Sequence, residues 1–384
     1  MAENTRIVIV GGGIAGLSAA QAARETNQDA QITMILQEPH LPYYRTRICE
    51  VLSGLDAEKL AVRPQEWFEE RNIELVYGEA AEISTMSGRV YLAEGSYLPF
   101  DELILACGAD GNLFDLPGSE GHEVFALRSL ADVRRLQQSS GPCVIIGGGL
   151  LSLEAAWHLS RTGRPVVVVE RGERLLKRQL DEEAADFLLQ IVVATGVRVA
   201  LEGRSSHYDG RQLILQDGRG FAADTVLFAA GITPRNYMGM QASADVRRGI
   251  IVDAQMRTSE PHIWACGDCA EFEGHTRGLW STAQDQGRVA GINAAGGSAV
   301  YDPQSMPYTM VAMGTKLWSF GRFDAADAVC RKSRPDGMLK KMFFEEERLV
   351  GAILIGDISL ALKLKKAVAA GMLKSEVLAQ YIDA

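Results

Sequence analysis

The stretch that decides the fold lies near the N-terminus and reads Arg6-Ile7-Val8-Ile9-Val10-Gly11-Gly12-Gly13-Ile14-Ala15-Gly16-Leu17-Ser18-Ala19-Ala20. Four consecutive β-branched apolar residues predict a strand that is buried on both faces. A G-x-G-x-x-G pattern follows at Gly11, Gly13 and Gly16, and an alanine-rich run with helical spacing comes after it. In such a turn the first glycine allows the tight bend, the second lets a pyrophosphate approach bare backbone, and the third lets the helix pack against the strand. The helix N-terminus presents unpaired N–H groups and a partial positive charge to phosphates.

An acidic residue at the end of a second strand completes this unit. Residues 31–36 (Q-I-T-M-I-L) predict the strand, and Glu38 lies 22 residues after Gly16. A carboxylate at this spacing accepts hydrogen bonds from a ribose hydroxyl. A glycine-rich turn alone is weak evidence, but strand, turn, helix and acidic residue together predict a dinucleotide-binding site.

The same pattern recurs later in the chain as Pro142-Cys143-Val144-Ile145-Ile146-Gly147-Gly148-Gly149-Leu150-Leu151-Ser152. Gly147 repeats Gly11 after 136 residues, and Ser152, a small residue that still allows close packing, replaces the third glycine. This internal repeat predicts a second dinucleotide site.

The strand of the second site, residues 165–169, ends at Glu170. A carboxylate there repels the 2′-phosphate of NADPH and favours NADH. Arg171 and Arg174 lie just beyond Glu170 and could offset this preference, so NADPH stays possible.

Composition limits the class of protein. A chain of 384 residues predicts two or three domains, and its 47% hydrophobic and 23% charged residues are typical of soluble globular proteins. The net charge of −10 argues against nucleic acid as a partner. No run of 18 apolar residues occurs, so no membrane partner is expected, and the early first strand leaves no room for a signal peptide. Six scattered cysteines favour the reducing cytoplasm.

We expect an α/β fold with two Rossmann-like dinucleotide-binding domains and a small α+β C-terminal domain. The expected ranges are 1–110 for the first part of the first domain, 111–238 for the second domain, 239–300 for the return to the first, and 301–384 for the C-terminal domain. Strands are expected there at 309–313, 317–320, 341–345 and 349–355, before a helix at 360–370. Residues 301–384 have 12 basic and 10 acidic residues, against 27 and 39 in residues 1–300, so only the C-terminal segment leans basic.

Three further segments occur in an order that points to a family: Leu105-Ala106-Cys107-Gly108, Ala229-Ala230-Gly231-Ile232-Thr233-Pro234-Arg235, and Thr258-Ser259-x-Pro261-x-Ile263-x-Ala265-x-Gly267-Asp268. With the two glycine motifs, the order resembles the pyridine-nucleotide:disulfide oxidoreductase superfamily over essentially the whole chain. The resemblance implies that the first site holds FAD and the second NADH. Asp268 also follows a strand-ending glycine, from which a carboxylate reaches a ligand across the sheet edge.

The resemblance implies specific site residues. The FAD-binding residues would be Gly11, Gly13, Ala15, Gly16, Glu38, Arg45, Arg47, Cys107, Gly108, Gly267 and Asp268. The residues around the nicotinamide dinucleotide would be Gly147, Gly149, Ser152, Glu170 and Gly231. Glu154 would lie near the contact between nicotinamide and flavin and is a candidate catalytic residue. No metal site is expected.

Residues 42–50, P-Y-Y-R-T-R-I-C-E, and the C-terminal segment resemble NADH:rubredoxin oxidoreductases and the flavoprotein portion of assimilatory nitrite reductases. This resemblance implies an enzyme that passes electrons from NADH through the flavin to a separate small iron protein, such as rubredoxin. Arg45 and Arg47 would stabilise the reduced flavin as catalytic residues, or are arginines at the start of a surface helix. Related ferredoxin reductases have a lysine where this chain has Glu50.

Because rubredoxins are acidic, basic residues near the C-terminus are candidate docking contacts: Lys340, Lys341, Lys363, Lys365 and Lys366. An ordinary solvated helix face is the alternative interpretation. The sequence does not predict an oligomeric state.

Two other functions stay open. Cys49 lies in the segment where single-cysteine members of the family carry a redox thiol, so an NADH oxidase or a disulfide or persulfide reductase is one alternative. Its position is shifted from the family's, which favours a packing role. Cys266 and Cys269 have C-x-x-C spacing but flank the Gly-Asp pair, so a dithiol there is disfavoured. The other alternative is a non-catalytic protein that responds to FAD and NAD(H).

Overall fold

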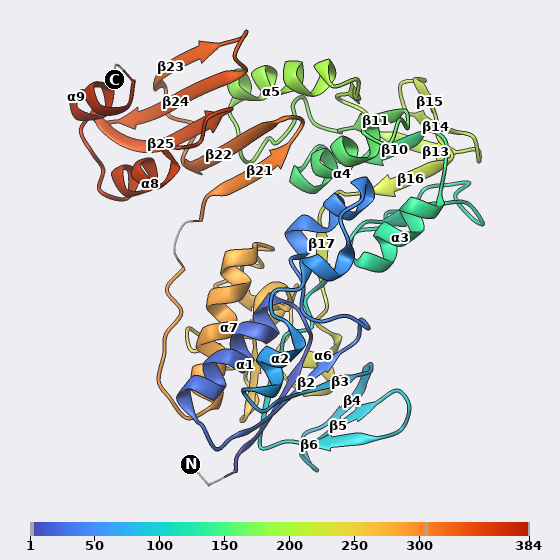
Figure 1. The fold of residues 1–384 in the computed structure, drawn as a ribbon, viewed down its shortest axis with the longest axis vertical. Coiled ribbons are helices and arrows are strands. Elements are labelled where there is room, and N and C mark those ends of the chain that lie inside the picture. Colours follow the sequence, from blue (N-terminus) through green and yellow to red (C-terminus); the bar gives the residue numbers. More distant parts are fainter. Residues whose placement is uncertain (1–3, 304–305, 383–384) are drawn as a thin grey trace. The chain divides into compact units, whose positions relative to one another are not determined.

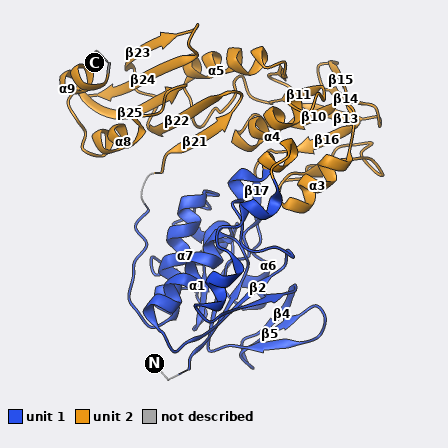
Figure 2. Ribbon diagram, viewed as in Figure 1, with its two compact units in different colours: residues 1–48, 56–110, 232–304 blue, residues 49–55, 111–231, 305–384 orange. Residues whose placement is uncertain are grey.

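The structure, a computed structural model, describes residues 4–303 and 306–382. The chain forms two compact units, shown in blue and orange in Figure 2. Unit 1 comprises residues 1–48, 56–110 and 232–304, and unit 2 comprises residues 49–55, 111–231 and 305–384. The chain therefore passes between the units several times, and a short segment at 49–55 belongs to unit 2.

A five-stranded parallel sheet forms the centre of unit 1. Its strands, in spatial order, are β19 (Ile263–Ala265), β7 (Glu102–Leu105), β1 (Arg6–Val10), β2 (Gln31–Leu36) and β3 (Ile73–Tyr77). Residues 7–10 of β1 are at most 7% exposed, because β1 is central in the sheet and covered on both faces. The doubly buried strand expected from the apolar run is confirmed.

Two helices of unit 1, α1 (Ile14–Thr26) and α7 (Trp280–Ala294), lie against each other (Figure 1). A Cβ atom on Gly287 or Gly291 of α7 would overlap the carbonyl oxygens of Ala15 and Ala19 in α1. The backbones of the two helices therefore meet directly, and this contact fixes the start of α1, where the first glycine motif lies.

The remaining elements of unit 1 are short. An antiparallel sheet contains β4 (Ala80–Ser84), β5 (Arg89–Leu92) and β6 (Tyr97–Pro99). Two-stranded pairs join β8 (Ala109–Gly111) to β17 (Ile232–Pro234) and β18 (Ile250–Val252) to β20 (Ala270–Phe272). The short helices are η1 (Arg45–Ser53), η2 (Ala57–Leu60), α2 (Gln65–Glu69), α6 (Tyr237–Gln241) and η3 (Gly267–Cys269). The second half of η1 belongs to unit 2.

Unit 2 repeats the parallel arrangement of unit 1. Its five-stranded sheet has the order β12 (Arg198–Ala200), β11 (Val166–Val169), β10 (Cys143–Ile146), β16 (Thr225–Phe228) and β9 (Val124–Ala126). The helices are α3 (Leu130–Gln138), α4 (Leu150–Ser160) and α5 (Glu182–Ala194). A small antiparallel sheet contains β13 (Ser205–Tyr208), β14 (Gln212–Leu215) and β15 (Gly220–Ala222). The predicted internal repeat is therefore a second strand–turn–helix unit of the same kind.

The C-terminal part of unit 2 is an antiparallel sheet with its own core. Its order is β21 (Tyr308–Ala312), β22 (Thr315–Gly321), β25 (Arg348–Ile355), β24 (Met338–Glu345) and β23 (Asp327–Ser333), followed by α8 (Ala361–Ala369), α9 (Lys374–Val377) and η4 (Leu378–Ile382). The four strands and the helix expected here are present. The edge strand β23 is missing from the sequence interpretation because none of its residues is buried, so it has no apolar face to detect.

The predicted α/β fold with two Rossmann-like domains and a small C-terminal domain is confirmed. The exact domain ranges given above stay predictions. Within the described residues, no helix combines the length and apolar composition needed to cross a lipid bilayer.

Candidate functional site

The three glycines of the first motif have three different surroundings. Gly11 has φ +126°, and a Cβ there would overlap the carbonyl oxygen of Ala106 at the end of β7. A Cβ on Gly16 would overlap the carbonyl oxygen of Gly11. A Cβ on Gly13 would meet no protein atom within 4 Å. Backbone geometry and packing thus require Gly11 and Gly16, whereas Gly13 leaves bare backbone facing open space at the N-terminus of α1, as a bound pyrophosphate needs.

The second motif has the same geometry. Gly147 has φ +118°, and its Cβ would lie 2.6 Å from the carbonyl oxygen of Ala229. A Cβ on Gly149 would meet nothing within 4 Å. At the third position Ser152 is fully buried, and its hydroxyl donates a hydrogen bond to the carbonyl oxygen of Gly147. Here a side-chain hydrogen bond joins the helix to the turn, where the first motif has direct backbone contact.

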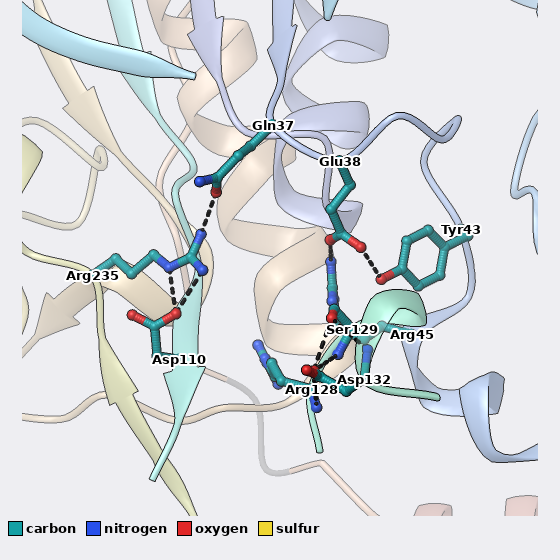
Figure 3. Close-up of polar contacts among 9 residues, drawn as sticks. All are labelled: Gln37, Glu38, Tyr43, Arg45, Asp110, Arg128, Ser129, Asp132 and Arg235. Atoms are coloured by element: carbon teal, nitrogen blue, oxygen red, sulfur yellow. Dashed lines mark hydrogen bonds and ion pairs between the residues drawn. The ribbon is translucent and has the colours of Figure 1, made fainter. Parts of the chain in front are cut away.

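The acidic residue of the first site is bound by neighbours from its own chain (Figure 3). Glu38 accepts hydrogen bonds from the Tyr43 hydroxyl (2.7 Å) and the Arg45 guanidinium (2.6 Å). Burial favours the neutral carboxyl, but the charge and hydrogen bond of Arg45 and the bond from Tyr43 outweigh it and lower the pKa of Glu38. Glu38 is therefore an anion held in a fixed position.

The acidic residue of the second site is bound differently. Glu170 accepts hydrogen bonds from the backbone N–H groups of Gly148 and Gly172, both at 2.6 Å. Gly148 is the central residue of the second glycine motif. The Glu170 carboxylate therefore connects the glycine turn to the segment that follows β11.

Strand register shows that Glu38 and Glu170 are not equivalent. The N–H groups of Gly11 and Gly147 donate to Ile35 and Val169, respectively, at 2.9 and 2.8 Å. The residue after Ile35 is Leu36, so Leu36 occupies in unit 1 the place that Glu170 has in unit 2. Leu36 packs on the middle glycine of its loop, whereas Glu170 hydrogen-bonds to it. The two carboxylates also differ in spacing, because Glu38 lies 22 residues after Gly16 and Glu170 lies 18 residues after Ser152, and the register shows which place each one takes.

The other residues expected to bind FAD gather in unit 1 where β1, β7 and β19 end. Gly267 has φ +77°, and its Cβ would lie 2.8 Å from the Cβ of Ala15. The N–H group of Gly267 donates to Gln286 of α7 (2.9 Å), and Asp268 follows in η3. Cys107 and Gly108 follow β7, with Gly108 at φ +74°. The structure thus brings together most of this predicted set.

Arg45 and Arg235 lie in segments that resemble the family, and both have hydrogen-bond partners in unit 1. Burial alone would lower the pKa of the Arg45 guanidinium. Nearby negative charges, among them those of Glu38 and Asp268, outweigh burial and raise this pKa. Arg47 is exposed. Arg235 pairs with Asp110 and donates to Gln37 at 2.9 Å (Figure 3), which joins β17 to the end of β2.

Glu154 lies in α4 in unit 2, in a group of side chains that sequence spacing does not reveal. Burial and the charge of Glu50 raise its pKa to about 8. From the segment 49–55, Ser53 makes a hydrogen bond of 2.7 Å with Nδ1 of His158 in α4, and Gln137 of α3 donates to the carbonyl oxygen of Val51. This segment therefore places Glu50 near Glu154, about a hundred residues apart in sequence.

Cys49, in the same segment, is almost completely buried. Burial, together with the negative charges of Glu154 and Glu50, raises the pKa of its thiol well above the usual range. A thiol in these surroundings is a poor nucleophile, because the thiolate is the reactive form. This supports the packing role inferred for Cys49.

Lys341, one of the expected docking residues, is not available to a partner, so the expectation for this residue is wrong. The ammonium of Lys341 in β24 lies 2.6 Å from Asp181 and 2.7 Å from Glu183, and its side chain is only 9% exposed. Lys332 of β23 also pairs with Glu183, at 2.6 Å. Lys341 therefore joins the C-terminal sheet to the start of α5 within unit 2. Lys363 and Lys366 are exposed, and Lys340 and Lys365 are partly exposed.

Comparisons with known proteins agree with these observations. Residues 5–287 match the family described as pyridine nucleotide-disulphide oxidoreductase, and residues 307–372 match the rubredoxin NAD+ reductase C-terminal domain. The chain is 32% identical to the NADH-rubredoxin oxidoreductase of Clostridium acetobutylicum, over 95% of each chain. It is also 32% identical to a nitrite reductase [NAD(P)H] of Bacillus subtilis over 92% of this chain, but spans only 46% of that protein.

Among solved structures, the crystal structure of a ferredoxin reductase from Rhodopseudomonas palustris is similar, with a TM-score of 0.88, 27% identity and 97% coverage of both chains. The family implies FAD and NAD(P)H, and the two glycine loops fit a dinucleotide each, because Gly13 and Gly149 leave their backbone open. The chain therefore belongs to the pyridine nucleotide-disulphide oxidoreductase family and is an FAD-dependent oxidoreductase that uses NAD(P)H.

Proposed function

We propose that this protein takes electrons from NADH and delivers them, through FAD, to a small iron protein such as rubredoxin. The observation that carries the proposal is the match of residues 307–372 to the rubredoxin NAD+ reductase C-terminal domain, which follows the oxidoreductase match at 5–287. The relative from Clostridium acetobutylicum, named as an NADH-rubredoxin oxidoreductase, covers both parts.

FAD, when bound, accepts a hydride from a nicotinamide and releases electrons singly. The chain's residues bind and orient: the first glycine loop would hold the FAD pyrophosphate, and Asp268 would reach the flavin's side chain. Arg45, fixed by Glu38, would place a permanent positive charge near the flavin and favour a negative charge there. Gly149 and Ser152 would shape the second loop, and Glu170 would favour NADH over NADPH.

Glu154 would keep a proton on its carboxyl group at neutral pH, because its pKa lies at about 8. A neutral carboxyl group places no second negative charge beside Glu50 and leaves the hydride path uncharged. We propose that this neutral form is the active form. Related ferredoxin reductases have a lysine at the position of Glu50. This chain cannot form a lysine–glutamate pair there, because Glu50 and Glu154 are both acidic.

The exposed lysines of α8 would bind the acidic partner. Lys363 and Lys366 lie one and four residues after Leu362, whose side chain is 77% exposed, so apolar and basic groups share this surface. Basic groups on one protein steer an acidic partner over distances comparable with the Debye length, about 10 Å at 0.1 M salt. Rubredoxin reduction should therefore slow steeply with added salt.

The experiment uses the purified holoenzyme, reduced anaerobically with NADH and mixed separately with rubredoxin, ferredoxin, a small disulfide and oxygen. We expect rubredoxin to be reduced fastest. Rapid reduction of the disulfide or oxygen that disappears in Cys49→Ser would establish the single-cysteine alternative instead. Flavin that NADH does not reduce would contradict the proposal outright.

The docking surface has its own matched test. The double variant Lys363→Glu/Lys366→Glu should lower the second-order rate with rubredoxin about tenfold or more at low salt. Lys59→Glu/Arg134→Glu changes the net charge equally at two exposed positions elsewhere and should leave that rate nearly unchanged. Equal losses in both double variants would show that net charge, not α8, controls docking.

A further inference from the structure

His158, in α4 of unit 2, is a buried titratable residue that has no part in the chemistry proposed so far. It is 9% exposed. Its Nδ1 atom lies 2.7 Å from the Oγ atom of Ser53, which ends η1. Ser53 itself is exposed. The hydrogen bond therefore joins a surface residue of the segment 49–55 to a buried side chain of α4.

The hydroxyl group of Ser53 has two partners, and together they fix the direction of both hydrogen bonds. One partner is Nδ1 of His158, and the other is the carbonyl oxygen of Glu50, to which the hydroxyl donates at 3.2 Å. A hydroxyl group has one proton, and a carbonyl oxygen can only accept. Both bonds form together only if Nδ1 of His158 carries a proton and donates to Ser53. The donors therefore run in order from His158 to Ser53 and from Ser53 to Glu50.

Helical spacing relates Glu50 to Glu154. Glu50 precedes Ser53 by three residues, which is one turn of a 3₁₀-helix and about 6 Å. Glu154 precedes His158 by four residues, which is about one turn of α4 and also about 6 Å. Each of the two residues in contact thus has a carboxylate one turn earlier on the same face of its helix. The negative charge of Glu50 acts on both Glu154 and His158, as neighbouring positions require.

We propose that His158 is a positioning residue that acts through Ser53 to hold Glu50 beside Glu154. Two carboxylates at close range repel each other, so the segment needs an anchor to keep Glu50 there. Gln137 of α3 fixes only the backbone of this segment, at the carbonyl oxygen of Val51. The inference rests on the proposed function, because it explains how Glu154 would keep the proton that the active form needs.

The charges around His158 assign the pH dependence to the two carboxylates. Burial and the charge of Arg161, three residues later in α4, lower the pKa of His158, and the charge of Glu50 opposes them. His158 is therefore mostly uncharged at neutral pH and acts through its hydrogen bond. From η1, the Cys49 thiol also stays neutral, because burial raises its pKa well above the usual range.

The test measures the protonation of Glu154 in the holoenzyme, without NADH or an electron acceptor. The unfolding midpoint of Glu154→Gln is compared with that of its parent from about pH 5 to pH 9, in the unaltered protein, in Ser53→Ala and in His158→Leu. In the unaltered protein the difference should level off near pH 8, where the pKa of Glu154 lies. In both altered backgrounds Glu50 can turn toward water, so the difference should level off about one pH unit lower. Levelling at the same pH in all three would overturn the proposal.

Conservative variants separate the hydrogen bond from packing. His158→Asn keeps an N–H donor near the position of Nδ1, and Ser53→Thr keeps the hydroxyl group, so both should level off at the unaltered pH. Ser160→Ala is the matched control, because it removes another serine hydroxyl of α4, which donates to the carbonyl oxygen of Trp157. If Ser160→Ala shifts the levelling pH as far as Ser53→Ala does, the effect comes from the stability of α4 and the positioning role is wrong.

A second measurement reads the hydrogen bond itself. The nitrogen chemical shifts of the His158 ring, assigned by their absence in His158→Asn, report which ring nitrogen carries the proton in the neutral form. We expect the proton on Nδ1 and a change of its shift in Ser53→Ala, whereas a proton on Nε2 alone would contradict the proposed order of donors. Neither measurement involves rubredoxin. An enzyme that does not reduce rubredoxin but shows the expected shifts would reject the proposed function alone, and unshifted levelling would reject this inference alone.

Discussion

The two glycine loops have the same backbone geometry but are held by different side chains. In unit 1, Gly16 lets α1 touch the turn directly, and Leu36 packs on the middle glycine. In unit 2, Ser152 donates a hydrogen bond to the turn, and Glu170 accepts one from its middle glycine. The loop of unit 1 is therefore fixed by close packing and the loop of unit 2 by polar contacts. Packing tolerates no added atom, whereas a hydrogen-bonded turn can lose one contact and persist.

The strongest test of this comparison places serine, the residue at position 152 in unit 2, at the equivalent Gly16 of unit 1. Gly16→Ser should destabilise unit 1 by about 3 kcal/mol, because the new Cβ overlaps the carbonyl oxygen of Gly11 and neither strand nor helix can move away. The purified variant should contain little FAD, as measured by its absorbance relative to protein.

The reverse change, Ser152→Gly, is the control. It removes one buried hydrogen bond and adds backbone freedom, so it should cost only about 1–2 kcal/mol and leave the FAD content normal. Normal FAD content in Gly16→Ser would mean that the first loop is as adaptable as the second.

A second contrast lies between buried charges. Lys341→Met removes the cation between Asp181 and Glu183. Breaking a fully buried pair costs about 3–5 kcal/mol, and the partial exposure of Glu183 should reduce this to about 2 kcal/mol. Thermal unfolding should show a loss in unit 2 while the FAD content stays unchanged.

Lys332→Met is the matched control, because its side chain is 43% exposed and pairs with Glu183. An exposed ion pair contributes about 0–1 kcal/mol. If both variants lose the same stability, Lys341 is not the residue that attaches the C-terminal sheet to α5.

The third test concerns Glu170. Glu170→Leu copies Leu36 and leaves the N–H groups of Gly148 and Gly172 without their acceptor. An unsatisfied buried donor costs about 1–3 kcal/mol, so the KM for NADH should rise about tenfold or more while FAD content stays normal. Equal kcat/KM values for NADH and NADPH in the unaltered enzyme would instead show that Glu170 does not select the cofactor.

Local sequence was sufficient for some of these features. The bends at Gly11 and Gly147, the open second glycines and the packing role of Ser152 depend on residues within one strand–turn–helix unit, so spacing alone predicts them. The contacts of Lys341 were not predictable, because Asp181 is 160 residues away and meets β24 only in the folded chain. Strand register was also needed to show that Glu170 corresponds to Leu36.

The side chains around Glu154 show the same limit. Glu50 lies near α4 because residues 49–55 pack within unit 2, and no periodicity in that segment predicts this packing. The roles of Arg45, Arg47 and Glu154 in binding and catalysis therefore stay predictions.

The last contrast concerns two carboxylates, which have opposite pKa shifts in the two units. Glu38 in unit 1 has a lowered pKa because Arg45 and Tyr43 outweigh its burial, and Glu154 in unit 2 has a raised one because burial and Glu50 act together. In the unfolded chain Glu154 ionises near pH 4.5, whereas in the folded protein it keeps its proton to about pH 8. Between these values the folded state binds more protons, so its stability falls as pH rises.

Glu154→Gln removes this titration. Its unfolding midpoint, measured against that of the unaltered protein, should therefore rise steadily from pH 5 to pH 8 and level off above, by at most about 1.4 kcal/mol per pH unit before screening by solvent. Glu38→Gln should show its pH dependence only below pH 4.5, where its midpoint falls relative to the unaltered protein as pH rises, and should stay lower by a constant amount above pH 4.5, because the anion that it loses stabilises the fold there. A midpoint difference for Glu154→Gln that does not vary with pH would mean that the carboxyl group is ionised in the folded enzyme, and the neutral form could not be the one that serves hydride transfer.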